Sequence, residues 1–360
     1  MQTGVNLTLS SIYKRKDGRW EGRIYKGNGN YVSYYAHSRQ DIEELLLHMS
    51  EKSVYSECRH SFKELFTQWF DNISLNIKES TACNYKMKAK THLIPYFKDI
   101  NCSEVNEKDI YGFINIKREE NLSDRYIADM IVMVKSVFKF GTKTYNYKNP
   151  FNGLKISFKK SEKVKVLDSE QYSALQKELA SENSRTSAAV SLAMATGLRI
   201  GELCALQWKD VDIKKRILTV SKTIQRIKSE DTVNKTKIII TDPKTESSKR
   251  LIPIPECIVS IIEKHKSKPE CFILSGTEKA CEPRTLQYRF QKILSNAKLP
   301  SVHFHSLRHV FATRCLQSGM DVKTLSEILG HSRIETTLNL YVHSSFEQKI
   351  KALNMVDMGF

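Results

Sequence analysis

Two polar, charge-rich joints, residues 51–60 and 155–165, interrupt the hydrophobic patterns of this 360-residue chain. The pattern alternates as in strands before the first joint, repeats at helical spacing between the joints, and is mixed after the second. At roughly 150 residues per domain, the chain is expected to fold as two or three domains. We therefore predict a multidomain α+β protein. Its expected parts are a small three-stranded sheet with one helix over residues 1–55, a helical bundle over 61–150, a basic linker over 151–165, and a mainly helical domain with a small antiparallel sheet over 166–360.

The first part carries strand patterns separated by turns. Strands are expected over residues 11–15, 19–25 and 31–35. Gly18, Gly27 and Gly29 supply the positive-φ positions that hairpin turns require, and Ser38 is expected to cap a helix over 42–49. Cations lie among the Tyr and Trp side chains of these strands, a mixture suited to a DNA groove. Those expected to contact DNA are Lys14, Arg15, Arg19 and Arg23. A solvated basic sheet without a partner is the alternative.

The second part repeats apolar residues at helical spacing. Helices are expected over 62–70, 81–93, 107–117 and 123–142, and Asn149-Pro150 ends the bundle. Lysines recur along two of these helices and predict positive stripes for phosphates, with solvated faces as the alternative. The stripes are Lys86, Lys88 and Lys90 on one helix, and Lys135, Lys139 and Lys143 on the other.

The charge balance favours a polyanionic partner. Lys and Arg number 57 against 40 Asp and Glu, which gives a formal net charge of +17. No stretch approaches the ~18 apolar residues of a membrane span, and the N-terminus lacks the pattern of an export signal. The eight cysteines contain no C-x-x-C pair, so neither a zinc cluster nor a disulfide framework is predicted. We expect a protein of the reducing cytoplasm that binds nucleic acid and no membrane.

One segment of the last part joins two helices through an arginine. An apolar helix stops at Gly197, and Arg199 precedes the next helix, where it can grip a phosphate beside helix N-terminal amides. Glu202, three residues on, can hold its guanidinium in position. A structural Arg–Glu pair that pins two helices is the alternative.

Two further segments each contain a histidine. His305 and Arg308 are three residues apart on an expected helix with Ser306 at its N-cap, so both can face the same point. Another helix ends just before His331, and the helix after that carries Tyr341. The histidine can carry a proton near neutral pH and the arginine is permanently charged. Together they suit a substitution reaction in which an oxygen carries negative charge.

These residue types predict phosphodiester chemistry. Two arginines, two histidines and a tyrosine, without paired carboxylates for magnesium, favour displacement by a protein hydroxyl over metal-activated water. No metal is therefore expected. A phenol has a pKa of about 10, so nearby cations or a base must assist its attack. A lysine that protonates the departing sugar oxygen would complete the site, and Lys244 is the candidate, at an expected hairpin turn between two strands.

In order and spacing, these segments resemble the motif boxes of tyrosine recombinases of the integrase type that phages and conjugative elements carry. The boxes are Thr196-Gly197-Leu198-Arg199 with Gly201-Glu202-Leu203, His305-x-Leu307-Arg308-His309, Leu329-Gly330-His331, and Tyr341.

The resemblance implies a role for each residue of the boxes. Arg199 and Arg308 would clamp the non-bridging oxygens of the scissile phosphate, with Glu202 in support, and Tyr341 would form a 3′-phosphotyrosyl bond. The remaining roles are general acid toward the 5′ hydroxyl for Lys244, general base or phosphate ligand for His305, and a hydrogen bond to the phosphate for His331.

The resemblance extends to the rest of the chain. It implies an arm-site DNA-binding domain over 1–55, a helical core-binding (SAM-like) domain over 61–150, and a catalytic domain over 166–360. The implied partners are double-stranded DNA with core and arm attachment sites, three further copies in a homotetramer, an excisionase and a DNA-bending host protein. The protein would work on the nucleoid of a bacterial cell. No cofactor is implied, because the phosphotyrosine stores the free energy of the broken bond.

The tail beyond Tyr341 predicts a docking face. Phe346, Ile350 and Leu353 fall on one side of an expected helix, which would dock on a neighbouring subunit or on its own domain.

Two other functions remain open at this point. A type IB topoisomerase uses the same phosphotyrosine chemistry to relax DNA but has less use for an arm-site module. A non-catalytic DNA-binding regulator would explain the charge and the domains without needing the arginines, histidines and tyrosine together.

Overall fold

The computed structural model describes residues 9–25, 31–54, 60–146, 148–159, 166–228, 236–242 and 249–338. The chain divides into two compact units, Met1–Glu162 and Lys163–Phe360. Within the described ranges, no helix has the length and apolar character that crossing a membrane requires.

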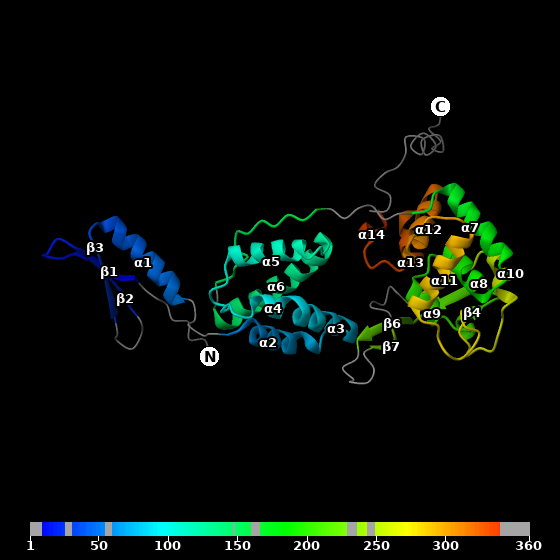
Figure 1. The fold of residues 1–360 in the computed structure, drawn as a ribbon, viewed down its shortest axis with the longest axis horizontal. Coiled ribbons are helices and arrows are strands. Elements are labelled where there is room, and N and C mark those ends of the chain that lie inside the picture. The colour runs from blue at the N-terminus through cyan, green and yellow to red at the C-terminus, as the bar shows by residue number, and fades with distance from the viewer. Residues whose placement is uncertain are drawn as a thin grey trace, which may run out of the picture. The chain divides into compact units, whose positions relative to one another are not determined.

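The first unit begins with an antiparallel sheet in the order β1-β2-β3 (Figure 1). Its strands are β1 (Leu9–Lys14), β2 (Trp20–Tyr25) and β3 (Tyr31–Ala36), and helix α1 (Arg39–Val54) follows. The backbone N–H of Asp41 donates to Ser38 Oγ at 3.0 Å, and the helix starts earlier than the predicted residue 42. Ile42 and Leu46 of α1 are buried with Ile24 of β2, which holds the helix on the sheet.

A helical bundle makes up the rest of the first unit. Its elements are α2 (Phe62–Ser74), α3 (Glu79–Lys88), a π-helical turn η1 (Ala89–Leu93), α4 (Ile94–Phe97), α5 (Glu107–Glu119) and α6 (Asp124–Tyr145). Phe62 and Phe97 are fully buried, with ring centroids 4.8 Å apart. The N–H of Ile94 bonds to the Ala89 carbonyl, five residues back, and Pro95 has no N–H to continue the regular helical pattern. The helix predicted over 81–93 therefore continues through a wider turn.

The second unit combines helices with two small sheets (Figure 1). The helices are α7 (Ser169–Ser181), α8 (Arg185–Thr196), α9 (Ile200–Ala205), α10 (Glu256–Glu263), α11 (Pro283–Asn296), α12 (His305–Gln317), α13 (Val322–Leu329) and α14 (Ile334–Leu338), with a 3₁₀ turn η2 (Trp208–Asp210). Strands β4 (Val211–Asp212), β5 (Ile217–Val220) and β8 (Arg250–Pro253) form one antiparallel sheet, and β6 (Thr223–Lys228) and β7 (Thr236–Thr241) form the other.

Helix α8 is the centre of this unit. It packs against α7, α10, α11 and α12, and Ala189, Val190 and Leu192 are fully buried. A helix that is apolar on most sides must be covered on most sides. The expected α+β architecture, with a small sheet in a mainly helical last part, is confirmed.

Gly201 lies where α9 packs against β6. A Cβ at this position would lie 2.6 Å from Thr223 Oγ1 and 2.7 Å from the Ile224 carbonyl oxygen. The carbonyl belongs to the strand backbone, so only a shift of the strand or the helix could make room. This close approach fixes the start of α9, and with it Arg199 and Glu202, against the sheet.

We expect Gly201→Ala to lower the free energy of unfolding of the second unit by about 1–3 kcal/mol, because the added methyl group overpacks this contact. Urea unfolding of the full chain measures the effect when Trp20 and Trp69 are replaced by Phe, which leaves the buried Trp208 as the only tryptophan. Ser295→Ala, at an exposed position of α11, is the control and should change stability by less than about 0.5 kcal/mol. Equal unfolding free energies for the two variants would contradict the expectation.

Candidate active site

Arg199 immediately precedes α9, and Glu202 lies in its first turn. Arg199 Nη1 donates to Glu202 Oε1 at 2.8 Å, and the backbone N–H of Arg199 donates to Glu202 Oε2 at 3.0 Å. The Arg199 side chain is 35% exposed, whereas that of Glu202 is 4% exposed. The carboxylate therefore holds the guanidinium from the protein side and leaves part of it open to a ligand.

Arg308 of α12 is buried and meets Arg199 at the end of α13. Its Nη1 donates to the Gly197 carbonyl at 2.8 Å, and its Nη2 donates to the Leu329 carbonyl at 2.6 Å. Arg199 donates to the same Leu329 carbonyl at 3.3 Å and to the Gly330 carbonyl at 3.1 Å. Burial and the charge of Arg199 lower the pKa of Arg308 to about 9. Two guanidinium groups that repel each other in this way favour an anionic ligand.

His305 is the first residue of α12. The residue before it, Phe304, occupies the N-cap position, so the expectation of Ser306 as N-cap is wrong: Ser306 is buried inside the helix and donates to the His303 carbonyl at 2.7 Å. The rings of His305 and His309 are in edge contact, with centroids 4.9 Å apart. Loss of hydration, together with His309, Arg308 and Arg199, lowers the pKa of His305 to about 4.

His331 follows the left-handed residue Gly330 (φ 64°) that ends α13. Its Nδ1 is 2.8 Å from Thr337 Oγ1 of α14, which orients the ring. Burial and then the charges of Arg308, Arg199 and Arg250 lower the pKa of His331 to about 4. Like His305, it is neutral near pH 7 and able to accept a proton or donate a hydrogen bond.

The sequence patterns do not single out Arg250 and assign no role to His309, although both lie at this cluster. Arg250, at the start of β8, donates to both oxygens of Glu202. A signal for Arg250 does exist. It precedes the buried Ile252 by two positions, and a strand places residues two apart on the same face. A buried arginine needs a carboxylate partner, and Glu202 supplies it.

Lys244 and Tyr341 lie outside the described residues, and so do the tail residues Phe346, Ile350 and Leu353. The strands on either side of Lys244 correct one expectation. β7 pairs with β6, and β8 pairs with β5, so the segment that carries Lys244 connects two different sheets and does not close a hairpin.

The arginines of the N-terminal sheet are paired with carboxylates. Glu21, only 2% exposed, accepts from Arg15 Nη1 at 2.8 Å and from Arg23 Nε at 2.9 Å, while Arg19 Nη2 pairs with Asp17 at 3.0 Å. Although burial favours the neutral acid, hydrogen bonds from Arg23, Ser33 and Arg15 lower the pKa of Glu21 to about 2. The guanidinium groups are thus held in fixed positions on the sheet and are not free cations. Lys14 is exposed on β1.

The two lysine stripes of the helical bundle differ from each other. Lys86, Lys90, Lys135, Lys139 and Lys143 are exposed, as a phosphate-binding stripe requires. Lys88 is buried, with its Nζ 3.7 Å from Asp129 Oδ2 and over the ring of Tyr126. The prediction that it belongs to an exposed stripe is therefore wrong. The reason is that Lys88 lies against α6, where a carboxylate and an aromatic face take up its ammonium group.

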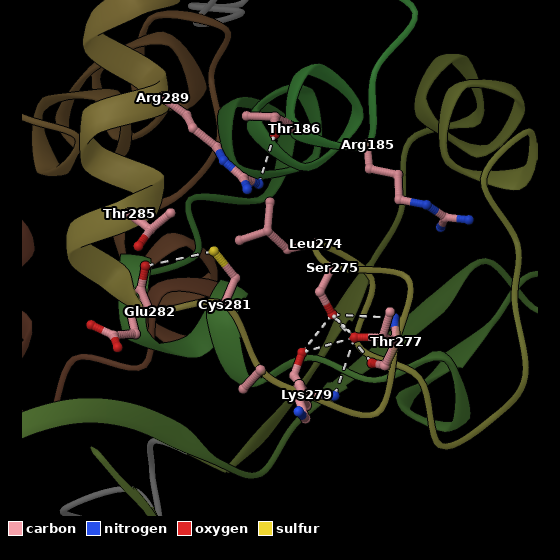
Figure 2. A pocket seen from close by; sticks show the side chains of 11 residues that line it. Arg185, Thr186, Leu274, Ser275, Thr277, Lys279, Cys281, Glu282, Thr285 and Arg289 are labelled. Carbon is pink, nitrogen blue, oxygen red and sulfur yellow. Dashed lines mark hydrogen bonds between the residues drawn. The ribbon is translucent and has the colours of Figure 1, made fainter. Parts of the chain in front are cut away.

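A separate pocket of about 450 Å³ opens between α8, α11 and the segment 274–282 (Figure 2). Arg185, Lys279 and Arg289 contribute its positive charge, and none of the predicted site residues lines it. A cavity of this size suits a small molecule, whereas a duplex needs an open surface. In the described part of the chain, no three His, Cys, Asp or Glu side chains gather as a metal site.

Two family profiles match the sequence. Residues 165–348 match the profile described as Phage integrase family, which is more than half of the chain. The chain belongs to the phage integrase family, the tyrosine recombinases. A second profile, Phage integrase, N-terminal SAM-like domain, matches residues 61–117.

Relatives cover most of the chain. It is 28% identical over 326 residues to a tyrosine recombinase XerC-like protein of Caldanaerobacter subterraneus subsp. tengcongensis, with 82% of each chain covered. It is 26% identical over 364 residues to the integrase of Staphylococcus phage L54a, with 87% of this chain and 98% of the phage protein covered.

Solved structures share the fold. The Tn1549 transposon integrase, in complex with circular intermediate DNA, is similar with a TM-score of 0.66 at 24% identity, covering 81% of this chain and 98% of the integrase. A lambda integrase dimer bound to a COC′ core site is similar with a TM-score of 0.58 at 17% identity, covering 94% of this chain and 96% of the lambda protein. The fold of the family therefore extends over both units.

We expect the imidazole groups of His305 and His331 to titrate near pH 4 in the DNA-free protein. Nitrogen chemical shifts of histidine-labelled protein measure this. Arg199→Gln should raise both pKa values, because the positive charge of Arg199 opposes protonation of each ring. In the unfolded chain, the same two histidines bind protons near pH 6.5. The free energy of unfolding of the second unit should therefore fall as the pH drops from about 6.5 to 4. Titration of both rings near pH 6.5 would show that the cluster does not act on them.

Proposed function

We propose that this protein is a site-specific DNA recombinase that integrates and excises a mobile element. One observation carries the proposal: Arg199 and Arg308 converge on the Leu329 carbonyl, beside His305 and His331 and ahead of Tyr341 in the chain. Relatives named as tyrosine recombinases and integrases support it.

The first strand cut uses the phenol of Tyr341. Its oxygen attacks the scissile phosphorus, a 3′-phosphotyrosyl bond forms, and the bond from phosphorus to the 5′ oxygen breaks. Arg199 and Arg308 neutralise the non-bridging oxygens, where negative charge accumulates in the transition state. The convergence of two guanidinium groups at one carbonyl supports this assignment.

The protons move through the remaining groups. His305, neutral at pH 7, takes the phenolic proton or binds the phosphate, and His331 donates a hydrogen bond to a phosphate oxygen. Lys244 gives a proton to the departing 5′ oxygen. The 5′ hydroxyl of a second strand then attacks the phosphotyrosine and reseals the backbone, so no high-energy cofactor is used.

The other parts of the chain bind DNA in this proposal. Residues 1–55 hold arm sites through the paired arginines of the sheet, 61–150 grip the core site, and 151–165 links them to the catalytic part, 166–360. Four copies act together on two duplexes, as the lambda integrase tetramer bound to a Holliday junction suggests. An excisionase and a DNA-bending host protein would set the direction of recombination, integration or excision. The reaction would take place on the nucleoid in the bacterial cytoplasm.

We expect Tyr341→Phe to abolish a covalent protein–DNA adduct while DNA binding stays within about threefold, because only the nucleophilic oxygen is removed. The substrate is a nicked duplex taken from the junction between the element and its host chromosome. Denaturing gel electrophoresis measures the fraction of DNA in the covalent adduct. Arg199→Lys should reduce the rate of its formation by roughly 10²-fold, because the bidentate contact is lost. Tyr288→Phe, an exposed tyrosine of α11, is the matched control and should leave the rate unchanged.

Each outcome separates the proposed function from its rivals. Binding without any adduct from the unmodified protein would indicate a regulator. An adduct without joining of two separate sites would indicate a topoisomerase that relaxes DNA. A normal adduct from Tyr341→Phe would move the nucleophile to another residue.

The exposed lysines of α6 give a second test. Lys135→Ala combined with Lys139→Ala should weaken DNA binding and reduce the slope of log K against log[salt] by about 2, at roughly 0.9 per phosphate contact. Binding titrations from low to moderate salt measure the slope. Lys88→Met, at the buried lysine, is the control and should leave the slope unchanged. An unchanged slope in the double variant would remove this stripe from the interface.

A further inference from the structure

Arg250 is a cation of the candidate site whose side chain is largely buried. Its side chain is 6% exposed, against 35% for Arg199. All three nitrogens of its guanidinium group donate to acceptors of the protein. Its Nη2 donates to Glu202 Oε2 at 2.9 Å, its Nη1 to Glu202 Oε1 at 3.2 Å, and its Nε to the Ile328 carbonyl.

Arg250 and Arg199 share both oxygens of one carboxylate. Glu202 Oε1 accepts from Nη1 of Arg199 at 2.8 Å and from Nη1 of Arg250. Glu202 Oε2 accepts from Nη2 of Arg250 and from the backbone N–H of Arg199 at 3.0 Å. Without Arg250, the carboxylate would lose its two-point attachment to β8 and could rotate away from Arg199.

Arg250 also completes a row of contacts at the end of α13. Three consecutive carbonyls accept hydrogen bonds there. That of Ile328 accepts from Arg250, that of Leu329 accepts from both Arg199 and Arg308, and that of Gly330 accepts from Arg199. This turn leads directly into His331. One side chain of β8 thus touches both the carboxylate that holds Arg199 and the turn that carries His331.

We propose that Arg250 is a positioning residue of the recombinase, which acts through Glu202 and the last turn of α13 to present Arg199 to the scissile phosphate. The proposal rests on the proposed function. A purely structural Arg–Glu pair is the alternative, and such a pair is often replaceable by apolar side chains at little cost in stability. The positioning role differs because the same carboxylate also holds a ligand-binding arginine.

The test compares Arg250→Met and Arg250→Lys in the full chain on the nicked duplex. Single-turnover formation of the Tyr341 adduct is measured at saturating DNA, and Kd is measured in parallel. We expect Arg250→Met to lower the rate by about 10- to 100-fold with Kd changed less than about threefold, because a misplaced catalytic group costs rate. Arg250→Lys keeps the charge but not the fork and should recover part of the rate. If Arg250→Met fails to fold, Arg250→Lys carries the comparison.

A double-mutant cycle distinguishes positioning from stability. Because Arg250 acts through Glu202, Arg250→Lys or Arg250→Met should lower the rate much less in a Glu202→Gln background than in the unmodified protein. Arg216→Met is the matched control, since Arg216 lies just before β5 of the same sheet and pairs with Glu256 of α10 at 3.2 Å, but its side chain is exposed. It should leave the rate and Kd unchanged.

The pH profile gives a readout that a structural role would not move. The charged groups that act on Glu202 are Arg199 on its own turn, Arg250 on β8 and Arg308 on α12. Burial alone would raise the pKa of Glu202, but the hydrogen bond and charge of Arg250, and then Arg199, hold it below its ordinary value. Arg250→Met should therefore shift the acid limb of the cleavage rate to higher pH, and Arg250→Lys should shift it less.

An unchanged cleavage rate in Arg250→Met overturns the positioning role but not the proposed function. The same holds if Arg250→Met lowers the rate by the same factor with and without Glu202→Gln. Absence of any adduct from the unmodified protein overturns the proposed function and this role with it. A reduced rate with unchanged Kd, a shifted acid limb and a non-additive cycle support the role.

Discussion

Glu202 is an almost fully buried carboxylate that lies between the guanidinium groups of Arg199 and Arg250. The arrangement of the site depends on it, because three arginines converge at the last turn of α13 and their repulsion in a poorly hydrated interior would oppose folding. The carboxylate offsets one positive charge. The carbonyls of residues 328–330, at the negative end of a helix, offset a further part. The positive charge that remains is available to an anion, and this is the property that the proposed phosphodiester chemistry uses.

The groups that would hold the phosphate are anchored in the core of the second unit. Arg199 is fixed by the close approach of Gly201 to β6, and Arg308 by its bond to the end of α8, the central helix. Burial and then the same cations keep His305 and His331 neutral near pH 7, so electrostatic binding and proton transfer are divided between different residue types. Tyr341 comes from the segment beyond α14. In the proposed function, the nucleophile is thus supplied by residues that follow, in the chain, those that would hold the phosphate.

Residue patterns predicted most of the elements and one ion pair of the cluster. Amphipathic periodicity placed α2, α5 and α6, and the spacing of Arg199 and Glu202 predicted their ion pair. Patterns failed where a neighbouring element decides the outcome. Lys88 belongs to a regular series of lysines, yet α6 buries it against Asp129. Lys244 follows a strand pattern, yet the pairing of β7 and β8 with other strands rules out the expected hairpin.

The sequence by itself determined the strand and helix patterns, the residues of the motif boxes and, through the resemblance of those boxes, the family, because these depend on residue types and their spacing along the chain. Only the tertiary structure decided that Arg250 joins the cluster and that Lys88 is buried. The physical reason is that a charged side chain finds its partner through contacts between elements far apart in the chain. Its burial and its ion pairs are therefore set by which elements meet, and local sequence does not encode that meeting.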